Sequence, residues 1–464
     1  MAGEWETVEL GEVAAVRSGY AFKSSDWTDA GIPVVKIANV KRGRLEMSGC
    51  SYVAESTASE AGEFQLTVGD ILIAMTGYIG DVARVRKTDL PCVLNQRVGK
   101  FSVHDVKRLD ANFLYTFLAW AETRQTIEGL GYGSAQPNVS PSLIHKVEMP
   151  LPPLAEQKAI AAVLGALDDK IELNRRMNAT LEAMARALFQ SWFIDFDPVR
   201  RNADRDQNQP SPQPSPTGRG SHTGNLPSPT GRRAGDEGLV EHDKLFPASF
   251  QDSELGHIPV GWKLGKVSEV SDFSRSSVNP GEFPEETFDH YSLPAFDEGR
   301  TPKEEPGGAI MSNKLVVTRN SVLLSKLNPH IPRIWLPDLH ASRRSVCSTE
   351  FIVASTRPGY SREFLFSLFT SASFASIYGT LVTGTTGSHQ RIRPESALEM
   401  KTVVPPPELV AVFTTITKPM FDQIHANLHQ SRTLATLRDT LLPKLLSGEL
   451  SVASINNHQQ TASR

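Results

Sequence analysis

The sequence predicts a protein of mixed α/β (α+β) class, with two globular domains separated by two long antiparallel coiled-coil helices in a pseudo-two-fold internal repeat. Three observations predict this: matched motifs recur in one order, each half carries a long heptad pattern, and each half mixes short strands with a helix. The 464 residues exceed the usual size of one domain. The predicted segments are a first domain at 1–150, a first helix at 151–198, a disordered linker at 199–248, a second domain at 249–404, a second helix at 405–450 and a flexible tail at 451–464.

The repeat is visible in short motifs that recur at a nearly constant offset. The offset is 257 residues for Trp5 and Trp262, and 254 for the pair Gly133-Ser-Ala-Gln136 and Gly387-Ser-His-Gln390. A proline-rich stretch follows in each half, at 149–153 and at 404–407, and a helical pattern follows each stretch. The chain is therefore ordered as domain, helix, domain, helix.

The globular halves contain matched strand and helix patterns. In the first half, strands are expected at 32–38, 70–75, 81–85 and 97–101, with one helix at 111–128. In the second half, strands are expected at 321–325, 333–336 and 349–353, with one helix at 362–378. Neither half shows the βαβ alternation of a doubly wound sheet.

Both long helices carry apolar residues at alternating intervals of four and three, which is a heptad seam. The first seam includes Ile160, Leu164, Leu167, Ile171, Asn174, Asn178, Leu181, Ala185, Leu188 and Trp192. The second includes Phe413, Thr417, Met420, Ile424, Asn427, Ser431, Leu434, Arg438, Leu441 and Leu445. Pro419 and Pro443 predict a kink or a break in the second helix.

Each seam turns polar at its centre, where Asn174 and Asn427 stand at corresponding positions. A buried asparagine in such a seam fixes register at some cost in stability, so the two helices can pair antiparallel, centre to centre. The alternative is that each helix packs only on its own domain. A run of about 37 residues extends ~55 Å, which is longer than a compact domain needs.

The segment 199–248 is rich in proline, glycine, serine and arginine, and it repeats Pro-Ser-Pro-Thr-Gly-Arg at 214–219 and 227–232. This composition cannot bury a core and predicts a disordered insertion. An inserted repeat without a role and an arginine-rich tail that touches DNA both remain open.

Composition limits the class of protein. The formal net charge of -4 excludes a basic footprint over the whole chain, so any nucleic-acid surface must be local. Cys50, Cys92 and Cys347 have no metal-ligand spacing and fit a reducing compartment. No signal peptide and no apolar run of membrane-spanning length are present. We therefore expect a cytoplasmic protein without a membrane partner and without a metal.

Several polar loops have side chains and backbone amides suited to DNA, including types that bond base edges in two places. The candidates in the first half are Thr76, Gly77, Tyr78, Asn95, Gln96, Arg97 and Gln136. Those in the second half are Lys326, Asn328, His330, Arg343, Arg344, Gln390, Arg391 and Arg393. Each alone is better explained as a solvated surface residue, but their recurrence at equivalent places in two repeats supports DNA contact equally well.

Motifs for catalysis are missing from the sequence. It has no Gly-x-x-x-x-Gly-Lys-Ser/Thr phosphate loop. It also has no Asn-Pro-Pro-Tyr/Phe or Asp-Pro-Pro-Tyr/Phe run of the adenine methyltransferases, and Pro337-Asp338 lies far from Glu399 and Lys401. This pattern agrees with a binding protein.

The segment Pro150-Leu-Pro-Pro-Leu-Ala-Glu-Gln-Lys-Ala-Ile160, continuing to Gln190-Ser-Trp-Phe193, resembles the central conserved region of Type I restriction-modification specificity subunits. Gly69-Asp-Ile-Leu-Ile73 with Gly77 and the stretch at 441–450 are also similar to that family. The chain departs from the family pattern in its long linker. In its second half, Asn320-Ser321 replaces Gly-Asp and Pro329 stands in the following loop.

The resemblance implies a role. Each globular half would be a target recognition domain that reads one half of a bipartite site in double-stranded DNA. The helices would act as a ruler, with the spacer residues Ile160, Leu164, Leu167, Ile171, Asn174, Leu181, Leu188, Met420, Ile424, Asn427, Leu434 and Leu441. They would also dock two methyltransferase subunits, which restriction/translocase subunits join. The chain would be non-catalytic, because S-adenosylmethionine, ATP and Mg²⁺ would bind to those partners.

Three other interpretations remain open at this point. The chain could be a coiled-coil scaffold without a DNA role, or a degenerate, inactive specificity subunit. A self-sufficient DNA methyltransferase or nuclease is the enzyme alternative, and it requires a cofactor site that the sequence does not offer.

Overall fold

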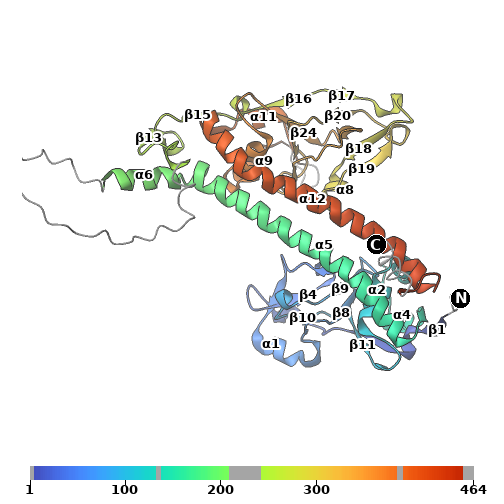
Figure 1. The fold of residues 1–464 in the computed structure, drawn as a ribbon. Helices are drawn as coiled ribbons and strands as arrows, with labels where there is room; N and C mark the ends of the chain where they lie inside the picture. The colour runs from blue at the N-terminus through green and yellow to red at the C-terminus, as the bar shows by residue number, and fades with distance from the viewer. Residues whose placement is uncertain (1–4, 132–136, 208–241, 384–389, 453–464) are drawn as a thin grey trace, which may run out of the picture. The chain divides into compact units, whose positions relative to one another are not determined.

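A computed structural model describes residues 5–131, 137–207, 242–383 and 390–452. The chain forms two compact units, Met1–Leu173 with Gln430–Arg464, and Asn174–His429. Two long helices, α5 (Leu154–Phe189) and α12 (Pro407–Leu446), each pass from one unit to the other (Figure 1). Each unit thus holds one sheet-bearing domain and half of each long helix. The predicted mixed class with two domains and long helices is confirmed.

The first domain is built on two four-stranded sheets. One sheet has the order β2-β11-β8-β9, with every pair antiparallel, and the other has the order β10-β4-β7-β3. The strands are β2 (Ala14–Ser18), β11 (Val98–Val103), β8 (Ile71–Ala74), β9 (Val82–Arg84), β10 (Val93–Leu94), β4 (Ile32–Val35), β7 (Ser51–Val53) and β3 (Trp27–Thr28). Two further pairs are the hairpin β5 (Val40–Lys41) and β6 (Arg44–Leu45), and β1 (Glu6–Glu9) with β12 (Glu148–Leu151). The helices are α1 (Glu55–Glu60), α2 (Ala111–Ala119), α3 (Ala121–Gly129) and α4 (Pro141–Ile144).

The second domain repeats the first sheet with the order β16-β24-β21-β22. These strands are β16 (Ser271–Ser274), β24 (Phe351–Thr356), β21 (Ser321–Ser325) and β22 (Ile334–Trp335). A five-stranded sheet joins β17 (Ser277–Val278), β20 (Lys314–Val316), β23 (Arg344–Cys347), β18 (Thr287–Tyr291) and β19 (Lys303–Pro306). The smaller pairs are β15 (Lys263–Lys266) with β27 (Lys401–Val404), β13 (Phe250–Ser253) with β14 (Gly256–Pro259), and β25 (Val382–Thr383) with β26 (Arg391–Ile392). The helices are α6 (Asp197–Gln207), α8 (Leu293–Asp297), α9 (Arg362–Thr370), α10 (Ala372–Thr380) and α11 (Pro394–Leu398).

Both domains interrupt the predicted helix at the same place. The sequence predicts one helix at 111–128 and one at 362–378, but the structure has α2 and α3 in the first case, and α9 and α10 in the second. The residues between them, Trp120 (ψ 138°) and Ser371 (ψ 146°), are extended. The Ser371 side chain accepts a hydrogen bond from the Phe374 amide and so caps α10. The single-helix prediction is therefore wrong in both halves, for a shared structural reason.

The long helices pack on each other inside each unit. In the first unit, Ile160 and Leu164 of α5 lie in one apolar cluster with Leu442 and Leu445 of α12. In the second unit, Phe189 of α5 packs on Phe413 of α12, among the core aromatics Trp192, Phe193, Trp262 and Phe364. Early residues of α5 thus meet late residues of α12, so the helix halves run antiparallel within each unit.

The second helix is continuous through Pro419 and Pro443. Neither proline breaks the helix, so this part of the prediction is wrong, and a kink at either proline stays a prediction. Val452 is also packed, since its amide donates to Glu156 at 3.1 Å and its side chain is buried. The predicted flexible tail therefore begins too early, and residues 453–464 lie outside the described residues.

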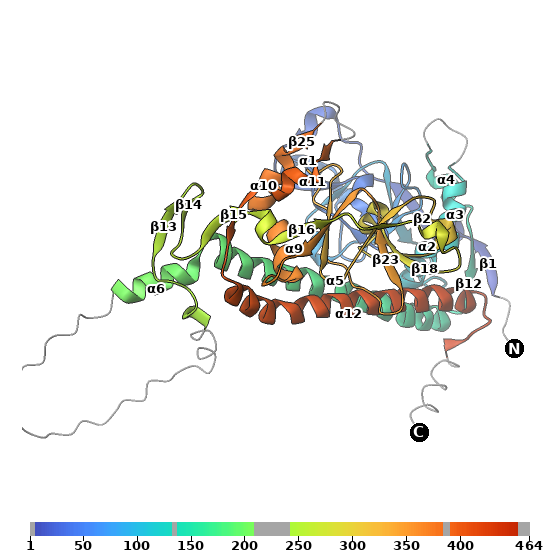
Figure 2. The ribbon, with the colours of Figure 1, turned by 90° about the horizontal axis from the view of Figure 1, so that it is seen from above.

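The predicted linker is structured at both of its edges. Residues 197–207 form α6, whose Arg201 and Arg205 pair with Asp243 at 3.2 and 3.4 Å. Phe246 is buried against Trp192, and Figure 2 shows α6 beside the hairpin β13–β14. The prediction of disorder is wrong for 199–207 and 242–248, because these residues pack on aromatic side chains far away in the sequence. Residues 208–241 lie outside the described part of the chain.

Within the described residues, no helix combines the length and the apolar character needed to cross a membrane.

Candidate nucleic-acid interface

Two matched loops follow the central strands of the two domains. The first loop is residues 75–81 between β8 and β9, and the second is residues 326–333 between β21 and β22. The third residue of each loop has a positive φ angle, 73° at Gly77 and 50° at Asn328. Glycine and asparagine are the residues that tolerate this left-handed conformation best. The two domains therefore turn the chain in the same way at the same point.

Each loop is also bonded to the segment that follows the broken helix. In the first domain, the Thr76 hydroxyl donates to Asn138 Oδ1 at 2.7 Å. In the second domain, the Asn328 amide donates to the Gln390 carbonyl at 2.9 Å, and the Ile392 amide donates to the Lys326 carbonyl at 3.0 Å. The structure thus brings Thr76, Gly77 and Tyr78 together in one place, and Lys326, Asn328, Gln390 and Arg391 in the other. Gln136 lies outside the described residues.

The loop tips present large side chains to solvent. Tyr78 is 59% exposed and Ile331 is 42% exposed, and His330 next to it is exposed as well. Thr76 is only 7% exposed, so its side chain positions the loop and is not available at the surface. Tyr78 and His330 are accordingly the best placed of the predicted residues on these loops.

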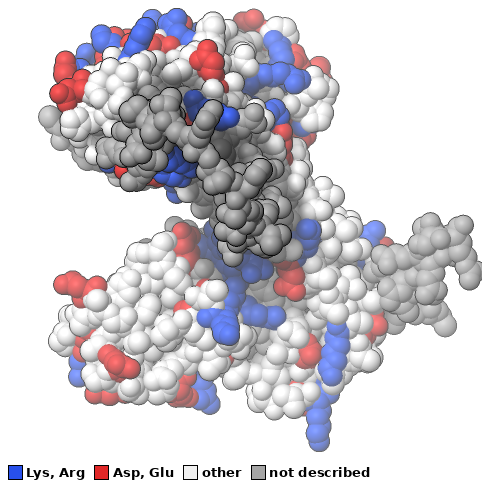
Figure 3. Space-filling model, turned by 60° about the vertical axis from the view of Figure 1, so that its left-hand side comes forward, with Lys and Arg blue, Asp and Glu red and all other residues white. Residues whose placement is uncertain are grey.

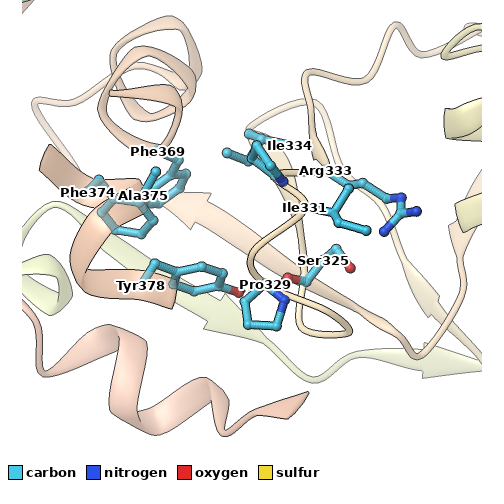
Figure 4. Close-up of a pocket in the computed structure, with 10 residues that line it drawn as sticks. Ser325, Pro329, Ile331, Arg333, Ile334, Phe369, Phe374, Ala375 and Tyr378 are labelled. Carbon is cyan, nitrogen blue, oxygen red and sulfur yellow. Dashed lines mark hydrogen bonds between the residues drawn. The ribbon is translucent and has the colours of Figure 1, made fainter. Parts of the chain in front are cut away.

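An apolar pocket lies behind the second loop. Figure 4 shows Pro329 and Ile331 of the loop opposite Phe374 and Tyr378 of α10. The Tyr378 hydroxyl donates to the Ser325 carbonyl at 3.0 Å, and burial raises the pKa of Tyr378, so the hydroxyl stays protonated as a donor. The α10 side chains Phe374 and Tyr378 therefore support the second loop.

Asn95, Gln96 and Arg97 form a turn beside β11, and its backbone is fixed. The Asn95 amide donates to the Val35 carbonyl at 3.0 Å, and the Gln96 amide donates to the Tyr20 carbonyl at 2.9 Å. The Gln96 and Arg97 side chains are exposed. A rigid turn with an exposed amide and an exposed guanidinium suits contact with a polar ligand such as DNA.

The predicted arginines of the second domain already have acidic partners. Arg343 bonds Asp289 at 2.8 Å and Glu304 at 2.9 Å. Arg344 donates to both carboxylate oxygens of Glu286, through Nε and Nη2, and this hydrogen bonding lowers the pKa of the Glu286 carboxyl and raises the pKa of Arg344.

Two further candidates lie at the end of this domain. Arg391 pairs with Glu350 at 2.8 Å, whereas Arg393 is exposed. A phosphate would have to compete with carboxylates at Arg343, Arg344 and Arg391.

Sequence reasoning missed the basic hairpin β5–β6 in the first domain. It carries Lys41, Arg42 and Arg44, with Gly43 at its turn (φ 80°). Lys41 Nζ lies 4.9 Å from the centre of the Tyr78 ring. The run Lys-Arg-Gly-Arg was the available signal, but strands of two residues have no readable periodicity. Figure 3 shows basic and acidic side chains interspersed on the face that it draws.

The polar centre of the helix seam is a buried hydrogen-bonded layer in the second unit. Asn174, Asn178 and Asn427 are 0%, 9% and 3% exposed. Asn427 Nδ2 donates to Asn178 Oδ1 at 2.8 Å, and Asn178 Nδ2 donates to the Ile424 carbonyl at 3.4 Å. The other predicted spacer residues of the two helices differ in burial. The buried ones are Ile160, Leu164 and Ile424, and the half-buried ones are Leu167, Ile171, Leu181, Leu188, Met420, Leu434 and Leu441.

No group of three or more His, Cys, Asp or Glu in the described residues could hold a metal. His425 and His429 stand one turn apart on α12, as paired metal ligands can. Their Nε2 atoms instead contact the Leu336 carbonyl at 3.2 Å and Asp338 at 2.7 Å. This pair fastens α12 to the second domain.

Comparisons with known proteins show which proteins the chain is similar to. Residues 2–183 match the family described as the Type I restriction modification DNA specificity domain. The chain is 24% identical to the MjaIX specificity subunit of Methanocaldococcus jannaschii, over 97% of this chain and 95% of that protein.

Two other relatives match shorter parts. The MjaVIII specificity subunit of M. jannaschii is 31% identical over 183 residues, which are 39% of this chain, and the chain spans 43% of that protein. The HindI specificity subunit of Haemophilus influenzae is 22% identical over 73% of this chain and 77% of that protein. The crystal structure of an S subunit from M. genitalium superposes with a TM-score of 0.49 at 16% identity, covering 95% of this chain and 96% of that one.

Proposed function

We propose that the chain is a specificity subunit of a Type I restriction-modification complex, because residues 2–183 match the DNA specificity domain of that family and the chain is similar to such subunits over most of its length. In this role it would read a bipartite site in double-stranded DNA for methylation and restriction. The observation that carries this proposal is the matched pair of loops, 75–81 and 326–333. In both loops the third residue has a positive φ angle, and both loops are hydrogen-bonded to the segment that follows the interrupted helix. Both loops also expose a large side chain, Tyr78 in the first and Ile331 in the second. Each domain would place its loop in the major groove, where every base pair has its own donor and acceptor pattern.

The other candidate residues keep their proposed roles in this scheme. Asn95, Gln96, Arg97 and Gln136 would serve the first domain. Lys326, Arg343, Arg344, Gln390, Arg391 and Arg393 would serve the second, with cations contacting phosphates that set the position on the duplex. The second domain would contribute less to affinity, because Arg343, Arg344 and Arg391 are engaged by carboxylates.

The helices α5 and α12 would fix the spacing between the two half-sites and dock two methyltransferase subunits, which restriction/translocase subunits join. S-adenosylmethionine, ATP and Mg²⁺ would bind to those partners, and this chain would be non-catalytic. The complex would work in the cytoplasm, which fits three buried, unpaired cysteines among the described residues.

The test is to coexpress the chain with its methyltransferase partner and to map methylated adenines in the host DNA. We expect one motif of two short half-sites with a constant spacer. Methylation by the purified chain alone would establish the enzyme alternative. Absence of sequence-specific methylation in an active complex would favour a scaffold or an inactive copy.

Shortening the helices tests the ruler. Residues 164–170 and 435–441 lie in the same unit, where Asp168 pairs with Arg438 at 2.6 Å. Deleting both segments removes one heptad from each helix, or about 10 Å. We expect unchanged half-sites and a spacer shorter by about 3 base pairs, since the DNA rise is about 3.4 Å per pair. An unchanged spacer in the methylation map would reject the ruler.

A further inference from the structure

The hairpin β5–β6 is held rigidly against the first domain. The Gly43 amide donates to the Val82 carbonyl at 2.8 Å. The Gly43 carbonyl accepts from Arg86 Nη2 at 3.3 Å and from the Tyr115 hydroxyl at 3.5 Å. Asn39 Nδ2 closes the base of the hairpin by donating to the Glu46 carbonyl at 2.9 Å. The cations of this hairpin are therefore presented on a fixed support.

Two of these cations lie beside the loop 75–81. Lys41 Nζ stands over the Tyr78 ring, 4.9 Å from its centre. Arg42, whose side chain is 72% exposed, has its Nε 3.5 Å from Oδ1 of the buried Asp81 at the end of the same loop. The loop is itself fixed, because the Asp81 amide donates to the Tyr78 carbonyl at 3.1 Å and the Gly80 amide donates to the Ala74 carbonyl at 3.0 Å.

This arrangement has the chemistry of a DNA contact. An exposed aromatic side chain interleaved with cations can meet bases and phosphates together, as surfaces that bind nucleic acids do. Arg42 has five N–H donors in a planar fork that suits a phosphate, and its exposed position leaves room for one. The Tyr78 hydroxyl can donate and accept, so it can distinguish base edges.

We propose that Lys41, Arg42 and Tyr78 form one duplex-DNA contact of the first domain, with Lys41 and Arg42 on phosphates and Tyr78 on base edges as a specificity-determining residue. The inference rests on the proposed function and adds the hairpin to it. The second domain offers a different contact there, because its tip carries His330 and Ile331, while Arg343 and Arg344 bond carboxylates.

The test uses the complex of the full chain with its methyltransferase subunits and two labelled duplexes, one with the mapped motif and one scrambled. Dissociation constants are measured by fluorescence anisotropy over a range of salt concentrations. Lys41→Ala and Arg42→Ala should each weaken binding to both duplexes by a similar factor. Each change should also reduce the slope of log K against log salt concentration by about 1. Tyr78→Ala should leave that slope unchanged and lower the preference for the motif by about 5- to 100-fold.

Arg17→Ala is the matched control, because Arg17 is an exposed arginine of the same domain that pairs with Glu63 at 3.2 Å. It should change neither the slope nor the preference. Tyr78→Phe keeps the ring, so a loss of preference in this variant assigns the effect to the hydroxyl. If Arg42→Ala lowers the unfolding temperature, Arg42→Gln replaces it in the same measurement.

Two results separate the failure of this inference from failure of the proposed function. The hairpin contact is overturned if the Lys41, Arg42 and Tyr78 variants bind with the same salt slope and the same preference for the motif as the unaltered chain. The proposed function would still stand in that case. If the unaltered complex binds the motif and the scrambled duplex equally, the proposed function itself fails.

Discussion

Loss of the Asn427 side chain should destabilise the polar layer between α5 and α12. The change Asn427→Ala removes the Nδ2 donor that lies 2.8 Å from Asn178 Oδ1. Asn178 is only 9% exposed, so water cannot replace that donor without opening the helix pair. Leaving a buried acceptor without its partner costs about 1–3 kcal/mol, and we expect the free energy of unfolding to fall by that amount.

A second partner contributes little to this loss. Gln423 Nε2 donates to Asn427 Oδ1 at 2.9 Å, but Gln423 is exposed and water can take the place of the acceptor. The variant Gln423→Ala is thus the matched control, with an expected change within about 0.5 kcal/mol. Urea unfolding followed by far-ultraviolet circular dichroism measures both variants.

The triple change Asn174→Leu, Asn178→Leu and Asn427→Leu completes the test. It removes every side-chain amide of the layer, so no buried asparagine is left unpaired, and stability should equal or exceed that of the unaltered chain. The apolar seam no longer fixes register, and the methylation map should then show more than one spacer length. The reasoning is refuted if Asn427→Ala is as stable as the unaltered chain, or if the triple variant is less stable than Asn427→Ala.

Three further outcomes are expected. Asn328→Ala should weaken recognition of the second half-site while Asn328→Gly preserves it, because φ is 50° there; equal methylation by both variants would contradict a role for that conformation. Thr76→Val should reduce the preference for an intact over an altered first half-site by about 5- to 10-fold, because Asn138 loses its hydroxyl partner; methylation kinetics on oligonucleotides with the intact and the altered half-site measure this. Burial lowers the pKa of His425 from its ordinary 6.5, so the folded chain binds fewer protons than the unfolded one, and the unfolding temperature should decline as pH falls below 6.5. His425→Gln should make the unfolding temperature decline less steeply with falling pH. The same dependence on pH in the variant and the unaltered chain would argue against a contribution from His425.

The sequence predicts those features that local periodicity encodes. Strand β21 matches its predicted range, 321–325, because three of its five residues form one short apolar run with a serine at each end. The helix seams were readable because intervals of three and four place side chains on one face. The repeat supports the predicted order of elements, since the same order occurs in each half.

The rest depends on contacts that are distant in the sequence. Trp120 and Ser371 end helices inside segments whose composition continues to favour helix, because tertiary packing overrides propensity. Arg343 and Arg344 look available for phosphate until the fold brings Asp289 and Glu286 to them, 54 and 58 positions away. The hairpin β5–β6 is a candidate only because the fold places Lys41 over the Tyr78 ring, 37 positions away in the sequence.

The division of the chain also has a consequence for its synthesis on the ribosome. The unit Asn174–His429 is continuous, so all of its residues emerge before the last segment is made. The other unit joins the first 173 residues to a segment that begins at Gln430, and Leu442, Leu445 and Val452 pack on its core. The domain that is translated first is therefore completed last. Until then, Ile160 and Leu164 lack their apolar contacts from the last segment. Such exposed apolar surface invites aggregation, so translation pauses or premature stops after the second domain should harm the first domain more than the second.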